Sequence, residues 1–99
     1  MQTLTEAWAV FIIHLQKMGK APLTLKQYKI DGKQFIQYCW DQEEDYLRDE
    51  TIKQLVKDYR EHVQERYDNT QSINRKFASL RTFLHYAHFR EWIQTVPEA

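Results

Sequence analysis

The chain contains few of the residues that cross-link or interrupt a fold. Its single cysteine, Cys39, excludes a disulfide within the chain, and we expect it to be a small apolar core residue. Two glycines and two prolines in 99 residues leave long uninterrupted stretches, which favours helices over hairpins. No apolar run approaches the length needed to span a membrane, and the first residues lack a signal-peptide pattern. We therefore expect a cytoplasmic protein that has no membrane contact.

The chain also lacks net charge, but its charges are unevenly distributed. It has 14 Lys and Arg against 14 Asp and Glu, which at first argues against nucleic-acid binding. Residues 41–50 hold six of the acids and one base, so the other 89 residues carry 13 bases against eight acids. A binding partner responds to the local field and not to the total. The distribution therefore favours a basic surface, with charges that only solvate helix faces as the alternative.

Apolar residues recur at helical spacing in four segments, which predicts one compact all-α domain of four helices. Thr3, Thr24 and Thr51 each precede a Glu or Gln by three residues, a capping-box pattern that predicts the starts of three helices, with Asp49 as an alternative cap for the third. Residues 67–69 supply a cap for the last helix. The expected helices cover residues 4–18, 24–40, 51–66 and 70–88.

The last expected helix has an apolar side and an opposite polar side. The apolar side consists of Ile73, Phe77, Leu80, Leu84 and Ala87. The opposite side carries Arg75, Ser79 and Thr82, which provide a fixed positive charge and two hydroxyls with almost no acid nearby. Because such groups suit contact with phosphates, we expect the function on this side. The aromatic residues that follow predict that Trp92 and Ile93 fold back over the core.

The second expected helix offers another polar surface. Its first turn exposes free amides beside lysines, so residues 20–27 form a candidate anion site. Ile30 lies among polar neighbours, where it could contact a sugar or a thymine methyl group, or could simply be a scattered surface apolar residue.

The residue patterns of common catalytic and metal sites are absent. His85 and His88 lie one turn apart, but no third ligand follows at a usual spacing. There is no glycine-rich phosphate loop and no nucleophile elbow. The carboxylates of residues 43–45 fall in a solvated loop that we expect to be flexible. We therefore predict no catalytic residue, metal ligand or cofactor.

Two stretches carry a resemblance to a known family. The run from Ser72 to Tyr86, Ser-Ile-Asn-Arg-Lys-Phe-Ala-Ser-Leu-Arg-Thr-Phe-Leu-His-Tyr, resembles the last helix of the core-binding domain of tyrosine recombinases, the phage-integrase type. Residues 24–28, Thr-Leu-Lys-Gln-Tyr, with Phe35 further on, resemble the second helix of that domain, a SAM-like orthogonal bundle. The chain departs from the family where Val96-Pro97 replaces the usual Asn-Pro, and it lacks the glycine that often follows the last helix.

The resemblance implies that the second and fourth helices present a shared basic face to double-stranded DNA. It implies a role in DNA integration or recombination, in which this domain positions a separate C-terminal catalytic domain on a recombination half-site. It also implies a linker from about Pro97 and contacts between protomers on DNA. Because the His-x-x-Arg signature of the catalytic domain is absent, this chain should not be an enzyme by itself. The candidate DNA-binding residues are Lys20, Thr24, Lys26, Gln27, Ile30, Lys33, Ser72, Asn74, Arg75, Lys76, Ser79 and Thr82.

The roles of two residues on the last expected helix stay ambiguous. Asn74 could contact DNA or serve local structure, and Arg81 lies between the apolar and polar sides.

A different class of function also remains open. The alternative is a helical protein–protein interaction module with an exposed aromatic edge, since interfaces favour aromatic anchors. Its candidate anchors are Trp40, Phe83, Phe89 and Trp92.

Overall fold

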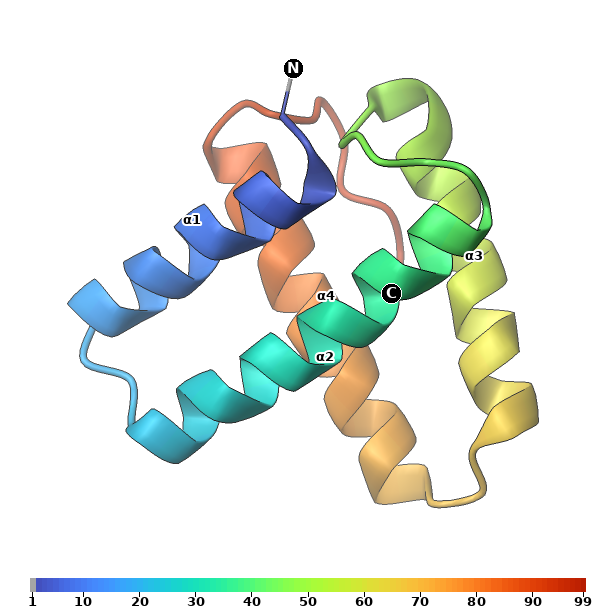
Figure 1. Cartoon of the computed structure of the whole chain (residues 1–99), viewed down its shortest axis with the longest axis horizontal. Helices are drawn as coiled ribbons and strands as arrows, with labels where there is room; N and C mark the ends of the chain where they lie inside the picture. The colour runs from blue at the N-terminus through green and yellow to red at the C-terminus, as the bar shows by residue number, and fades with distance from the viewer. Residues whose placement is uncertain (1) are drawn as a thin grey trace.

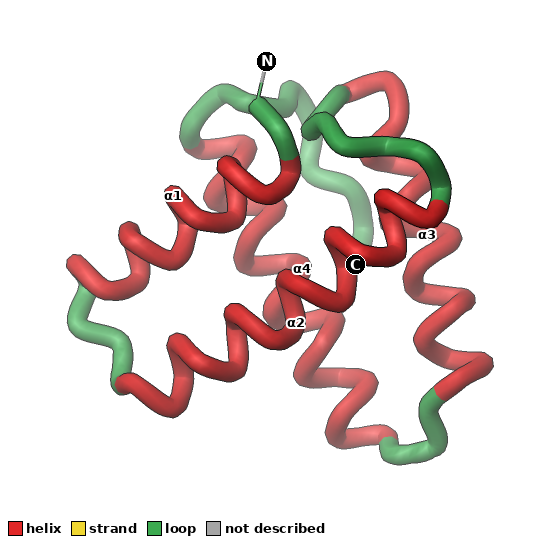
Figure 2. Tube along the Cα trace, viewed as in Figure 1, coloured by secondary structure: helices red, strands yellow, loops and turns green. Residues whose placement is uncertain are grey.

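The structure, a computed structural model, describes residues 2–99. Within that range it shows four α-helices and no β-strand. The helices are α1 (Leu4–Lys17), α2 (Pro22–Asp41), α3 (Asp49–Arg66) and α4 (Thr70–Phe89). Short loops join them (Figure 2). The expected all-α four-helix domain is confirmed.

Two of the expected helix starts are confirmed by the capping groups. The Thr3 hydroxyl oxygen accepts a hydrogen bond from the Glu6 amide at 3.0 Å, at the start of α1. The Asn69 side-chain oxygen accepts one from the Ser72 amide at 3.1 Å, at the start of α4. Each cap satisfies a backbone donor that has no partner within its helix.

The capping boxes predicted for the other two helices are wrong. Helix α2 starts at Pro22 after the N-cap residue Ala21, and proline suits this position because the first turn does not need its amide. Helix α3 starts at Asp49 after the N-cap residue Arg48, again without a side-chain cap. Both helices therefore begin two residues before the expected starts.

Helices α1 and α2 lie side by side, α4 crosses behind them, and α3 packs against α2 and α4 at one end (Figure 1). Aromatic side chains join these layers. The Trp8 ring of α1 stacks on the Phe83 ring of α4 at a centroid distance of 4.3 Å, and Phe11 packs edge-on against both rings at 5.5 Å. Cys39 is buried, as expected, and burial raises the pKa of its thiol to about 12.

The acidic segment between α2 and α3 is held in place, contrary to the flexible loop that we expected. The Leu4 amide donates to the Asp45 carbonyl at 2.8 Å, and the Leu47 amide donates to the Gln2 carbonyl at 2.9 Å. Within this segment the Glu44 carboxylate accepts hydrogen bonds from the Thr51 hydroxyl at 2.8 Å and from the Tyr46 amide at 3.2 Å.

Glu44 also illustrates how these contacts act on ionisation. Partial burial works to raise the pKa of Glu44, but the hydrogen bonds from Thr51 and Tyr46 and the nearby Arg48 cation outweigh it, so that its pKa is lowered. The carboxylate is therefore kept ionised as a structural acceptor between α2 and α3.

The segment after α4 covers one side of the core. Ile93 is buried and the Trp92 ring packs edge-on against Tyr86 at 5.6 Å, which confirms that these residues fold back. Pro97 is also buried, and Arg81 donates a hydrogen bond to the Ala99 carbonyl oxygen at 2.9 Å. The chain therefore stays packed against the domain beyond Pro97, where we expected a linker to leave it.

Candidate nucleic-acid interface

A cluster of polar side chains joins α2 to α4 where the two helices cross. Its centre is Asp31 of α2, which is only 3% exposed. One carboxylate oxygen accepts a hydrogen bond from the Ser79 hydroxyl at 2.6 Å, and the other accepts from Gln27 at 3.2 Å and from the Arg75 guanidinium at 3.3 Å. The Lys76 ammonium forms an ion pair with the same carboxylate at 3.9 Å. We call these five residues the Asp31 cluster.

The Asp31 cluster corrects two of the predicted DNA-binding residues. Ser79 is 5% exposed and Lys76 is 4% exposed, so neither lies on the surface as expected. The Lys76 ammonium also donates to the Gln34 side-chain oxygen and lies over the Tyr67 ring. Burial lowers the pKa of Lys76, and the neighbouring Arg75 cation lowers it further, whereas the Asp31 carboxylate opposes both. Both residues stabilise the packing of α4 on α2, because a buried acid needs their donors.

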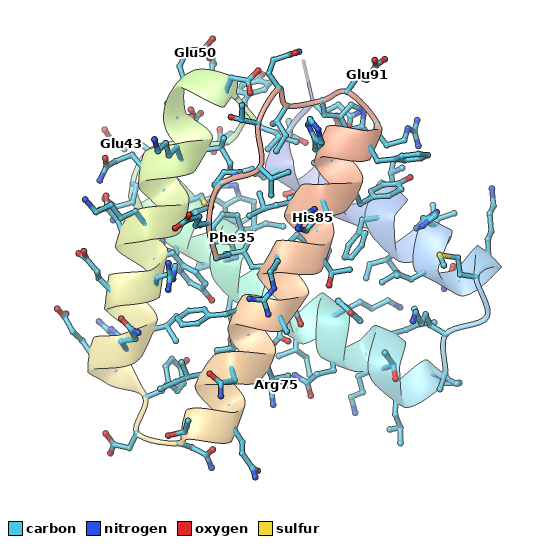
Figure 3. All side chains as sticks on the ribbon, turned by 180° about the vertical axis from the view of Figure 1, so that it is seen from behind. Phe35, Glu43, Glu50, Arg75, His85 and Glu91 are labelled. Atoms are coloured by element: carbon cyan, nitrogen blue, oxygen red, sulfur yellow. The ribbon has the colours of Figure 1, made fainter. Side chains whose placement is uncertain are left out.

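Arg75 is the member of the cluster that reaches solvent. Its side chain is 41% exposed, and it lies on the N-terminal half of α4 (Figure 3). A guanidinium has five N–H donors, and among the described residues only the contact with Asp31 uses one. Asp31 therefore orients Arg75, while the other donors remain available to a ligand.

The remaining candidates on α4 differ in how accessible they are. Asn74 and Thr82 are exposed, and Ser72 is half-buried. The Thr82 hydroxyl donates to the Ala78 carbonyl at 2.9 Å, which leaves its oxygen able to accept a hydrogen bond. These residues lie within three turns on either side of Arg75.

The candidates on α2 do not all face α4. Thr24, Lys26, Ile30 and Lys33 are exposed, as is Lys20 in the loop before α2, whereas Gln27 is half-buried and bonded to Asp31. At about 100° per residue, Lys26 points about 140° around the helix from Asp31. Lys33 lines a groove against α1 together with Lys29. The predicted shared face is therefore divided, with the α2 lysines on one side of the helix and the Arg75 contact on another.

The two helices nevertheless differ from the rest of the chain in charge. Together they carry six bases, and α4 contains no acid at all. Of the two acids of α2, Asp31 is buried and paired, and Asp41 is the last residue of the helix. Helix α3 mixes five acids with four bases, so its surface produces little net field. The six bases of α2 and α4 are Lys26, Lys29, Lys33, Arg75, Lys76 and Arg81.

Sequence reasoning missed Asp31, the residue that organises this site. The only available signal was an acid located among the lysines of α2, four residues after Gln27. Its partners Arg75 and Ser79 are more than 40 residues away in the sequence, so no local pattern connects them to it.

The aromatic residues proposed as anchors for a protein partner also separate into two groups. Phe83 is fully buried and Trp92 is half-buried, which removes Phe83 as an anchor. Trp40 and Phe89 are 46% and 76% exposed.

In residues 2–99 no group of three or more His, Cys, Asp or Glu side chains could hold a metal ion, and no helix is both long and apolar enough to cross a bilayer.

The comparisons with known proteins identify no relative, because no family model, curated protein or solved structure matches the chain. The resemblance to the core-binding domain of tyrosine recombinases therefore remains a prediction from the sequence.

Proposed function

We propose that this chain binds double-stranded DNA through α2 and α4, as the core-binding domain of a site-specific tyrosine recombinase. The observation that carries the proposal is Arg75, held by a buried carboxylate at the crossing of the two most basic helices with its other donors open to solvent. Arginine in a fixed orientation is suited to bidentate contact with phosphate or with guanine. A separate catalytic domain of the full-length protein would then act on the bound half-site.

The division of the basic surface suits a helix that enters a groove. An α-helix with its side chains is about 10–12 Å across, and the major groove of B-DNA is about 12 Å wide. With residues 22–33 of α2 in the groove, Lys26 and Lys33 would meet the phosphates of one strand, and Gln27 and Arg75 would face the other. Ile30 would point at the base edges between them.

The first turn of α2 adds a further contact for phosphate. It has no side-chain cap and no acidic residue, so its free amides face solvent beside Lys20 and the exposed Thr24. Amides at a helix N-terminus favour anions because of their direction and the helix dipole. On α4, Asn74 and Thr82 would extend the contact along the strand that Arg75 meets.

This arrangement predicts weak binding that depends strongly on salt. About four phosphate contacts, from Lys20, Lys26, Lys33 and Arg75, give a slope of log K against log salt of about −4. Non-specific affinities of this kind are in the range of about 10⁻⁴ to 10⁻⁶ M at physiological salt. The isolated chain should therefore bind measurably at low salt and dissociate as salt rises.

Replacing Arg75 with alanine should lower the affinity for duplex DNA about tenfold and reduce the magnitude of the salt slope by about one if Arg75 holds a phosphate. A fluorescence anisotropy titration at several salt concentrations measures both quantities. Lys57→Ala, at an exposed position of α3, is the matched control and should change neither. Unfolding curves must show that the Arg75 variant remains folded. An affinity and slope equal to those of the unaltered chain would remove Arg75 from the interface.

The recombinase assignment has its own test. If the full-length protein continues past Ala99 with an arginine, a His-x-x-Arg pair and a late tyrosine, its catalytic domain is of the type that the resemblance implies. A continuation without these residues would leave DNA binding as a separate property.

A further inference from the structure

An apolar groove lies between α1 and α2, on the side of the molecule opposite α4. Figure 1 shows that no other helix covers this side. The groove has a volume of about 480 Å³, and its floor includes the buried side chains of Trp8, Ile12 and Ile36. Ile13 and Trp40 also line it and are 49% and 46% exposed. Large apolar side chains exposed along one groove of a monomer indicate a surface that another molecule covers.

The charged residues near this groove change sign along α2, from lysines to acids. The only charged residues that line the groove are Lys29 and Lys33. At the C-terminal end of α2, exposed Asp41 follows Trp40 directly and exposed Glu43 comes two residues later. Asp41 lies just beside the groove, where it lines the neighbouring pocket between α2 and α3 together with Lys33 and Gln37 and accepts a hydrogen bond from the Gln37 side chain at 3.1 Å. Within residues 2–99 none of these four charges takes part in an ion pair of the chain itself. The surface therefore has a basic end, an apolar middle and an acidic end.

We propose that this surface is a two-fold interface with a second copy of the chain, in which the two α2 helices pack antiparallel. A surface that meets its own copy across a two-fold axis must be self-complementary. Lys33 and Asp41 are each four residues from Gln37, about 6 Å along the helix axis in opposite directions. A two-fold axis at Gln37 therefore brings Lys33 level with Asp41 of the second copy, and the reverse pair forms at the same time.

The same register accounts for the apolar groove. Trp40 comes within one helical turn of Lys33 of the second copy, where its ring can cover the groove that Ile13 and Ile36 line. Exposed tryptophan is enriched at the centre of protein interfaces. A partner with a different sequence would need its own aromatic and charged residues in this order, whereas a second copy supplies them by symmetry. The interface uses α1 and the C-terminal half of α2, so it shares Lys33 with the proposed DNA contacts but none of the contacts of α4.

The test is the self-association of the whole chain without DNA, followed by sedimentation equilibrium. The unaltered chain should form dimers as its concentration rises, and Trp40→Ala should raise the dissociation constant at least about tenfold. Phe89→Ala is the control, since it removes an even more exposed aromatic ring from the end of α4, and should have no effect. A chain that stays monomeric up to about 1 mM, or dimers that Trp40→Ala leaves unchanged, would overturn the proposal.

A charge exchange tests the two-fold register itself. Lys33→Asp alone places two acids together at each contact, and Asp41→Lys alone places two lysines together, so each variant should dimerise less than the unaltered chain. Mixed in equal amounts, the two variants should form heterodimers, because both contacts then pair a lysine with an aspartate. The substituted residues are exposed, so circular dichroism should show unchanged helices. A mixture that stays as monomeric as the separate variants would contradict the antiparallel register.

Discussion

Replacing Asp31 with alanine should lower the free energy of unfolding by about 3–5 kcal/mol, the cost of removing one partner from a buried ion pair. The substitution leaves the Lys76 ammonium and the Ser79 hydroxyl buried where α2 meets α4, without the carboxylate that both contact. Exposed ion pairs contribute far less, because water screens them. Urea unfolding followed by circular dichroism measures the change.

Two further variants separate the effect of charge from that of volume. Asp31→Asn keeps the side-chain size and an acceptor for Ser79 but removes the charge, so it should destabilise less than alanine does. Replacing Asp31 with leucine, Lys76 with methionine and Ser79 with alanine together removes the buried polar groups of the cluster and leaves only the half-buried Gln27 and Gln34 and the exposed Arg75 to pair with water, so it should recover much of the lost stability. If Asp31→Ala cost less than about 1 kcal/mol, the view of Asp31 as the residue that joins α2 to α4 would be wrong.

Gly32→Ala should lower the free energy of unfolding by about 2–3 kcal/mol, although alanine is the better helix former by about 1 kcal/mol. A Cβ atom at Gly32 would lie 2.2 Å from the Trp8 ring, where α1 and α2 approach each other. The ring cannot easily move, because it stacks on Phe83 and its Nε1 donates to the Tyr28 carbonyl at 3.1 Å. The added methyl group must therefore push the two helices apart.

Gly19 provides the control for this substitution. It has a φ of +82°, and a Cβ there would meet no atom within 4 Å, so Gly19→Ala tests backbone strain without overlap. Its cost should be about 1–2 kcal/mol. Combining Gly32→Ala with Trp8→Phe should recover part of the loss if overlap with the ring is the cause. Thermal unfolding of the four proteins measures these differences, and a Gly32→Ala variant as stable as the unaltered chain would show that the close approach is not needed.

The helices were predictable because their apolar spacing is a local property of the sequence. Thr3 and Asn69 marked two starts correctly, since a cap acts within its own turn. Thr24 was wrong as a helix start because α2 begins at Pro22. Proline is tolerated in the first turn of a helix, but elsewhere it ends a helix, so its presence in the sequence is compatible with both. The exact start of a helix depends on which capping residue or proline prevails, and the sequence alone does not rank these local signals.

The site was harder to predict because it depends on how helices cross. From α4 alone, Ser79 belongs to the polar side, and polar usually means exposed. The structure turns that side toward Asp31 on α2, which buries Ser79 and leaves Arg75 at the edge. A helical pattern gives the direction of each side chain around its own axis, but it contains no information on the neighbouring helix 40 or more residues away.

Chemical-shift mapping with a duplex of random sequence at low salt tests the central claim most directly. If α2 and α4 bind DNA, the amide signals that move should cluster in residues 20–34 and 71–82, and those of α3 should stay in place. The shifts should reverse as salt is added, because phosphate contacts release counterions. Shifts confined to α3, or none with duplex on the order of 1 mM, well above the non-specific dissociation constants expected, would contradict the proposed interface.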